Sequence, residues 1–125
     1  MKGCNFVANL DLEGIQIELY IKARPGLQQF LTEMSRLYEL VVFTSSPKAI
    51  ADGILKHIDK SGLIKHRLYR DKCLNLNQVY YLKDMRKLNR DPSNVVFVDV
   101  ILFSNSVQHR HRSHATSQFL SYFKV

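Results

Sequence analysis

Three side chains have the chemistry to bind a phosphate group. Two of them directly follow predicted strands, and the third lies between these two in the chain. Thr44 directly follows the apolar run 40–43, Asp99 directly follows the apolar run 95–98, and Lys83 lies between them in the chain. A hydroxyl, an ammonium and a carboxylate that meet at one edge of a sheet can hold a phosphate and a magnesium ion. Each also has a commoner role, because such residues often cap turns, end strands or face solvent.

A fourth candidate is the tripeptide Asp11-Leu12-Glu13, which looks like the start of a nucleophilic aspartate motif. The surrounding residues favour a different interpretation. Apolar side chains alternate with polar ones on both sides of Glu13-Gly14, at Phe6, Ala8, Leu10 and Leu12 and then at Ile15, Ile17, Leu19 and Ile21. A period of two on either side of a glycine-containing turn predicts a β-hairpin.

Two weaker candidates involve other reactive residues. His109, His111 and His114 have the spacing to bind a transition metal, but no acidic or thiol residue lies near them. Cys73 follows Arg70-Asp71-Lys72, and nearby cations can lower the pKa of a thiol. From the residues alone, Cys73 is either a reactive thiol or a packing residue.

The elements that must position Thr44 and Asp99 alternate between helix and strand. Pro25 suits a first helical position and Ser46 a helix cap, and each precedes apolar residues at helical spacing. The runs 40–43 and 95–98 are expected to be strands buried on both faces, and 68–69 and 79–81 short strands. This order predicts an α/β fold with a doubly wound parallel sheet, in which ligands bind at the carboxyl ends of strands.

The composition restricts the class of protein. A chain of 125 residues with 46% hydrophobic positions is expected to form one domain or part of one. It contains neither an apolar run of membrane-spanning length nor the pattern of a signal peptide, so we expect an intracellular protein. The net charge of +7 favours an anionic partner. Nucleic acid is an unlikely partner, because the basic residues are scattered and lack interleaved aromatic residues.

The motifs resemble a known family. In order along the chain come Arg24-Pro25-Gly26 before a helix, Phe43-Thr44 after a strand, "LYRDKC" at 68–73 and "LKD" at 82–84. Over residues 5–99 the sequence resembles the NLI-interacting-factor-like family of small C-terminal-domain phosphatases, within the haloacid dehalogenase superfamily. The resemblance implies magnesium-dependent dephosphorylation of serine or threonine in phosphoproteins through a phosphoaspartate. A mitochondrial import receptor subunit shares the domain, so both nucleus and mitochondrion are expected compartments.

The resemblance also assigns roles to residues of this chain. Thr44 matches the phosphate-binding hydroxyl and Lys83 the lysine that neutralises phosphoryl oxygens. Arg70 matches the arginine that contacts a substrate phosphopeptide, and Asp99 matches an acidic residue that supports the lysine and the metal site. Three leucines match the inserted hairpin that lines an apolar pocket for the peptide: Leu10, Leu12 and Leu19.

The sequence departs from the family at two places. Members carry the motif Asp-x-Asp-x-Thr on a buried strand, in which the first aspartate is the nucleophile and the second is the general acid. If Asp11 were the nucleophile, Glu13 would occupy the position of the general acid and Ile15 the position of the threonine. The family also places its whole inserted hairpin between the nucleophile and Arg24, which leaves too few residues after Asp11. We therefore assign residues 5–22 to that hairpin, with the nucleophile strand missing. In the family, the residue after the one matched by Asp99 is an asparagine or aspartate that binds magnesium. This chain has Val100 there, whose side chain has no lone pair to donate.

These departures lead to a division of the chain and to two functional hypotheses. We predict an incomplete phosphatase-like domain over residues 1–99, with the α/β part at 24–99, and a divergent tail over 100–125, where the composition shifts. The first hypothesis is a phosphatase-family chain that is catalytically incomplete, through a truncated gene model or as a pseudophosphatase, and that binds magnesium poorly. The alternative is a non-catalytic module that binds a phosphopeptide or a partner, such as an import receptor-like subunit.

Overall fold

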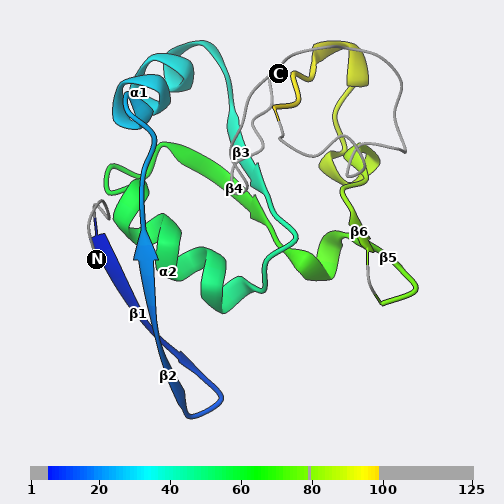
Figure 1. Ribbon diagram of the computed structural model, residues 1–125. Coiled ribbons are helices and arrows are strands. Elements are labelled where there is room, and N and C mark those ends of the chain that lie inside the picture. Colours follow the sequence, from blue (N-terminus) through cyan, green and yellow to red (C-terminus); the bar gives the residue numbers. More distant parts are fainter. Residues whose placement is uncertain (1–5, 79, 99–125) are drawn as a thin grey trace.

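The computed structural model describes residues 6–78 and 80–98. These residues form a mixed α/β fold of small sheets and two α-helices (Figure 1). The elements follow in the order β1 (Phe6–Leu12), β2 (Ile15–Ile21), α1 (Leu27–Leu37), β3 (Leu40–Phe43), α2 (Lys48–Ile58), β4 (Ile64–Leu68), η1 (Arg70–Lys72), β5 (Leu74–Leu76), β6 (Tyr80–Leu82), η2 (Met85–Leu88) and η3 (Pro92–Asn94). Within the described ranges, no helix has the length and apolar character needed to cross a membrane.

Strands β1 and β2 form the predicted hairpin. They pair antiparallel, with Leu12 opposite Ile15, so that Glu13 and Gly14 make the turn. Both turn residues have positive φ, 54° for Glu13 and 85° for Gly14. This is the conformation of a type I′ turn, which matches the twist of the two strands. Asp11 accepts a hydrogen bond of 2.8 Å from the amide of Gly14, which confirms that the tripeptide at 11–13 belongs to a turn.

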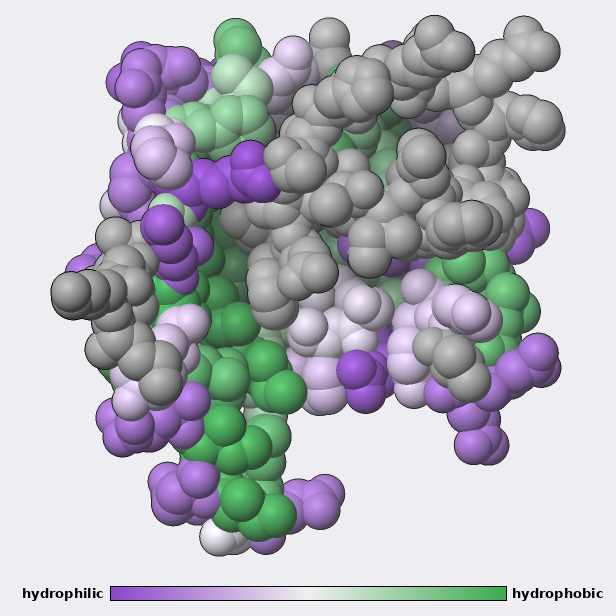
Figure 2. All heavy atoms as spheres, viewed as in Figure 1, coloured by the Kyte–Doolittle hydropathy of each residue, from purple (hydrophilic) through white to green (hydrophobic). Residues whose placement is uncertain are grey.

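The hairpin packs along α2 (Figure 1). Leu10 is buried, and its side chain lies directly over Gly53 of α2. The ring of Phe6 stacks on His57 of the same helix at 4.9 Å between ring centroids. Figure 2 shows hydrophobic residues gathered over the hairpin and the neighbouring part of the molecule. The hairpin is therefore attached to the rest of the fold by apolar contacts on α2.

The core surrounds β3, which is buried along its whole length, as predicted. One face of β3 packs against both helices in a cluster of buried residues: Leu31, Leu40, Val42, Ile54, Leu55, Ile58 and Ile64. The other face packs against η2 through Val41, Phe43 and Met85. β3 pairs with β4 in parallel, and α2 connects the two strands. This βαβ unit is the part of the predicted parallel sheet that the described residues contain.

Both helices begin later than predicted. The amide of Leu27 donates to the carbonyl of residue 24, and Gly26 has a φ of 80°, so Pro25 and Gly26 form a turn before α1. Proline followed by a glycine with positive φ is typical of a type II turn. At α2, the residue before the first helical turn is Pro47, with extended backbone, and not Ser46.

The predicted buried strand at 95–98 is wrong. The structure assigns no strand to these residues, and Val96 is 46% exposed. Val95 and Phe97 instead pack as irregular chain against the cluster beside β3. An apolar run forms a strand only when a neighbouring strand is available for pairing, and no other described segment pairs with this one. The predicted short strands at 68–69 and 79–81 correspond to the end of β4 and to β6, and Val79 lies outside the described residues.

Candidate functional site

Thr44 lies at the carboxyl end of β3 and begins the turn that leads to α2. Its amide donates to the carbonyl of Leu68 at 2.9 Å, which continues the pairing of β3 with β4 by one residue. Its hydroxyl oxygen accepts a hydrogen bond of 3.1 Å from the amide of Ser46. A threonine hydroxyl that binds an amide two residues later is a common turn motif. The side chain is buried, so both its position and its orientation are fixed.

Arg70, at the start of η1, is held against the turn that follows Thr44. Its amide donates to the carbonyl of Ser46 at 3.1 Å, and its Nε donates to the carbonyl of Ser45 at 2.7 Å. The guanidinium group lies 4.6 Å from the ring centroid of Tyr81 on β6. Arg70 is exposed, and of its guanidinium nitrogens only Nε forms a hydrogen bond with the described residues, so its other nitrogens can bind an anion.

Cys73 connects Thr44, Arg70 and Lys83 in space. Its Sγ lies 3.7 Å from the carbonyl oxygen of Thr44. Burial raises the pKa of this thiol to about 11, although the positive charges of Lys83 and Arg70 act in the opposite direction. The strand register agrees, because Leu74 pairs with Leu82 and Cys73 and Lys83 are the next residues outward, and the amide of Cys73 donates to the carbonyl of Arg70 at 3.0 Å. A thiol with this pKa stays protonated at neutral pH, which is the behaviour of a packing residue and not of a nucleophile.

Lys83 is buried and directly follows β6. Its ammonium lies 5.9 Å from the ring centroid of Phe97. The next residue, Asp84, fixes the chain at this point, because its carboxylate accepts hydrogen bonds from the amide and the guanidinium of Arg86. The guanidinium of Arg86 holds the pKa of Asp84 below its usual range. Asp84 belongs to the "LKD" motif of the sequence but was given no role there, although an aspartate directly before a helix start is a typical N-cap.

The structure thus brings together three of the predicted site residues, Thr44, Arg70 and Lys83, at the carboxyl end of β3. Asp99, predicted to support the phosphate and metal sites, lies outside the described residues. Among residues 6–78 and 80–98, no three His, Cys, Asp or Glu side chains lie close enough to bind a metal ion.

The predicted hairpin leucines lie on a different surface. Leu10 is buried over Gly53, and Leu12 is partly buried near the turn. Leu19 lines an apolar groove of about 280 Å³ between β2, the start of α1 and α2. The groove lining includes none of Thr44, Arg70 and Lys83. Contact of these leucines with a substrate peptide stays a prediction.

Comparisons with known proteins identify the family of this chain. The family model of the NLI interacting factor-like phosphatases matches residues 2–119, which extends beyond the predicted boundary at 99. A mouse protein named carboxy-terminal domain RNA polymerase II polypeptide A small phosphatase 2 is 32% identical over 79% of this chain and 36% of its own length. Phosphatase Herzog of Drosophila melanogaster is 34% identical over 76% of this chain and 27% of its own.

A third relative, phosphatase PSR1 of Saccharomyces cerevisiae, is 30% identical over 79% of this chain and 23% of its own length. The chain therefore spans about a quarter to a third of the length of these curated relatives. The family model covers most of the chain, and the sequence identities of 30–34% to these three relatives agree with that match. The chain belongs to the family of NLI interacting factor-like phosphatases.

Proposed function

We propose that Thr44, Arg70 and Lys83 bind the phosphate group of a phosphoserine or phosphothreonine in a protein partner. The observation that supports the proposal is that contacts with Cys73 and the β5–β6 register bring these residues to the carboxyl end of β3. Arg70 supplies a planar guanidinium that suits a phosphate, and Lys83 supplies a positive charge. Because Lys83 is buried, its charge acts at low effective dielectric and attracts a phosphate more strongly than a solvated lysine does.

The second part of the proposal concerns catalysis. Hydrolysis through a phosphoaspartate needs a carboxylate nucleophile beside the bound phosphate. Asp11 does not serve, because its two carboxylate oxygens accept hydrogen bonds from Gly14 and Gln16 within the exposed hairpin. The 125 residues by themselves therefore bind phosphate without turnover, and they bind magnesium poorly. The β3–α2–β4 unit is, on this proposal, part of a doubly wound sheet whose nucleophile strand is not in this sequence.

A second candidate function uses the hairpin groove. Leu19 on β2 and Ile50 and Ile54 on α2 give the groove an apolar lining that suits a segment of a protein partner. On this alternative the chain is a non-catalytic recruitment module, of the kind expected of an import receptor-like subunit. The compartment, nucleus or mitochondrion, stays a prediction under either function.

Peptide binding tests the proposal. A serine-proline peptide is titrated into the chain in phosphorylated and unphosphorylated form, and the two dissociation constants are compared by calorimetry. We expect the phosphopeptide to bind at least about tenfold more tightly, since charge-assisted hydrogen bonds to phosphate are absent for the free hydroxyl. Arg70→Ala is expected to remove most of this difference.

The matched control is Arg36→Ala, which removes an exposed arginine from the last turn of α1. It is expected to leave both dissociation constants unchanged. Equal affinities for the two peptides, or an Arg70→Ala variant that behaves as Arg36→Ala does, would contradict the proposal.

A further inference from the structure

A cavity with polar and apolar parts lies at the opposite end of β3 from Thr44. Glu39 directly precedes β3 and Thr44 directly follows it. Strands rise about 3.3 Å per residue, so the two Cα atoms are about 16 Å apart. The cavity beside Glu39 has a volume of about 340 Å³, which is within the range of small-molecule sites. It is therefore separate from the phosphate-binding residues of the proposed function.

The cavity has an apolar part formed by β3, β4 and the chain after β6. Its apolar side chains are Val41, Leu68, Leu88 and Val95. Three of these four also pack against the buried cluster of Val41, Phe43 and Met85, so this part of the cavity is supported by the core. A ligand with an apolar body can be bound here through burial of that body.

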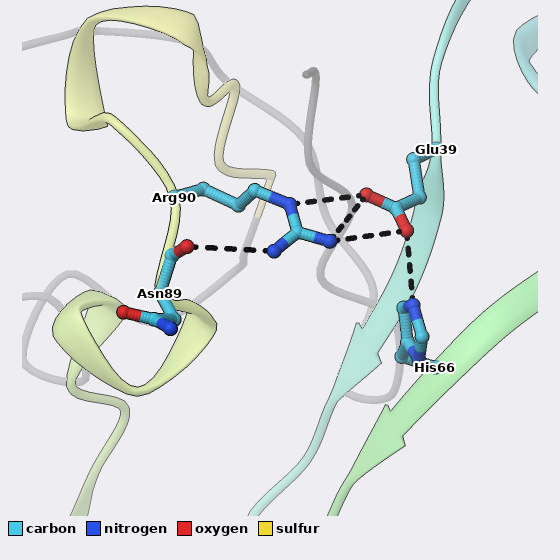
Figure 3. A network of polar contacts seen from close by, with 4 residues as sticks. All are labelled: Glu39, His66, Asn89 and Arg90. Carbon is cyan, nitrogen blue, oxygen red and sulfur yellow. Dashed lines mark hydrogen bonds and ion pairs between the residues drawn. The ribbon is translucent and has the colours of Figure 1, made fainter.

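Among the described residues that line the cavity, basic side chains outnumber acidic ones. Glu39 is the one acidic residue of this described lining. It accepts hydrogen bonds from the guanidinium of Arg90 at 3.2 to 3.4 Å and lies 2.9 Å from Nε2 of His66 (Figure 3). Arg67 also lines the cavity, but its guanidinium is paired with Asp52 at 3.0 Å.

Lys87 is the remaining cation. Its ammonium forms no hydrogen bond or ion pair with residues 6–78 or 80–98, and the nearby Asp84 carboxylate is already bound by Arg86. Because Arg90 neutralises the charge of Glu39, the positive charge of Lys87 is available to a ligand. We propose that this cavity binds a small organic anion, whose apolar body contacts Val41 and Leu88 and whose phosphate, phosphonate or carboxylate head faces Lys87. This inference does not depend on the proposed function.

The test is a titration of the full chain, labelled with nitrogen-15, with phenylphosphonate, which carries the required head and body and has no ester bond to hydrolyse. Amide shifts are followed by NMR. We expect saturable shifts at His66, Leu88 and Val95. Methylphosphonate, which lacks the apolar body, and benzyl alcohol, which lacks the charge, are each expected to bind at least about tenfold more weakly.

Two variants complete the test. Lys87→Gln is expected to weaken phenylphosphonate binding about fivefold, and Lys60→Gln, which removes an exposed lysine after α2, is expected to have no effect. Equal binding by Lys87→Gln and the wild type overturns the inference, as does equal binding of methylphosphonate. Shifts confined to Ser45, Ser46 and Arg70 also overturn it, while they support the separate phosphate site of the proposed function.

Discussion

A buried carboxylate shows how a single residue positions the candidate site. Asp84 is 3% exposed, and its carboxylate oxygens lie 2.8 to 3.1 Å from guanidinium nitrogens of Arg86. This pairing fixes the backbone next to Lys83. Because the pKa of Asp84 is lowered in the folded state, its contribution to stability is fully present above the pKa of the unfolded chain. The contribution is lost as the pH falls through the folded-state pKa.

Replacing Asp84 by asparagine is therefore expected to destabilise the fold. The change leaves the shape of the side chain but removes the charge that binds Arg86, at a cost of about 1–3 kcal/mol in the free energy of unfolding at pH 7. Urea unfolding at pH 7 and at pH 3 measures it, and the difference between variant and wild type is expected to shrink at pH 3. The control is Asp71→Asn, an exposed aspartate paired with Lys72 on the surface. A loss at Asp84 no larger than at Asp71 would contradict the assigned role.

At the scale of elements, the docking of the hairpin on α2 includes one very close contact, between Leu10 and Gly53. A Cβ atom added to Gly53 would lie 2.0 Å from Cδ2 and 3.3 Å from Cγ of Leu10. A glycine in the middle of a helix otherwise destabilises it by about 1 kcal/mol relative to alanine. Gly53 is therefore explained by the space that Leu10 occupies.

A double-mutant cycle between these two residues tests the docking of the hairpin. In a Leu10→Ala background, Gly53→Ala is expected to stabilise the fold by about 1 kcal/mol, because only the helix propensity changes. In the wild-type background the same substitution must displace Leu10 and is expected to lose that gain or more. Thermal unfolding of the four proteins gives the coupling energy. If Gly53→Ala stabilises both backgrounds equally, the hairpin does not pack on α2 in this way.

Some elements were predicted correctly from the sequence and others were not, for physical reasons. The hairpin was predictable because alternation and a glycine-containing turn are local signals that agree with each other. The helix starts were misplaced because Pro25 and Pro47 occur in turns and extended chain as readily as at a first helical position. The run 95–98 was misjudged because apolar composition does not reveal whether a pairing strand is present.

At the scale of the whole molecule, the order of elements places Thr44, Arg70 and Lys83 at the same end of β3, and the family motifs had singled out these three residues; their role in binding phosphate stays a prediction. The opposite end of β3 was not predicted. Its cavity depends on Glu39 meeting residues 27 and 51 positions later in the chain, His66 and Arg90. Contacts of this kind follow from how the elements pack and leave no local pattern in the sequence.

The expected lack of catalysis is also tested on the whole chain. We expect the purified 125 residues to show no magnesium-dependent hydrolysis of p-nitrophenyl phosphate, since Asp11 is bound within the hairpin turn. The release of p-nitrophenolate is followed by its absorbance, with Asp11→Asn and Asp71→Asn as a matched pair. Hydrolysis that Asp11→Asn abolishes and Asp71→Asn preserves would show that Asp11 is the nucleophile after all.

A substitution of Lys83 gives the sharpest test of phosphate binding at the carboxyl end of β3. Lys83→Met keeps the length and the packing of the buried side chain and removes its charge, and Lys65→Met makes the same change at an exposed position of β4. The quantity to measure is the ratio of affinities for a phosphorylated and an unphosphorylated serine-proline peptide. We predict that Lys83→Met lowers this ratio at least about tenfold and that Lys65→Met leaves it unchanged. The same ratio in the wild type and in Lys83→Met, with both proteins folded, would contradict the claim.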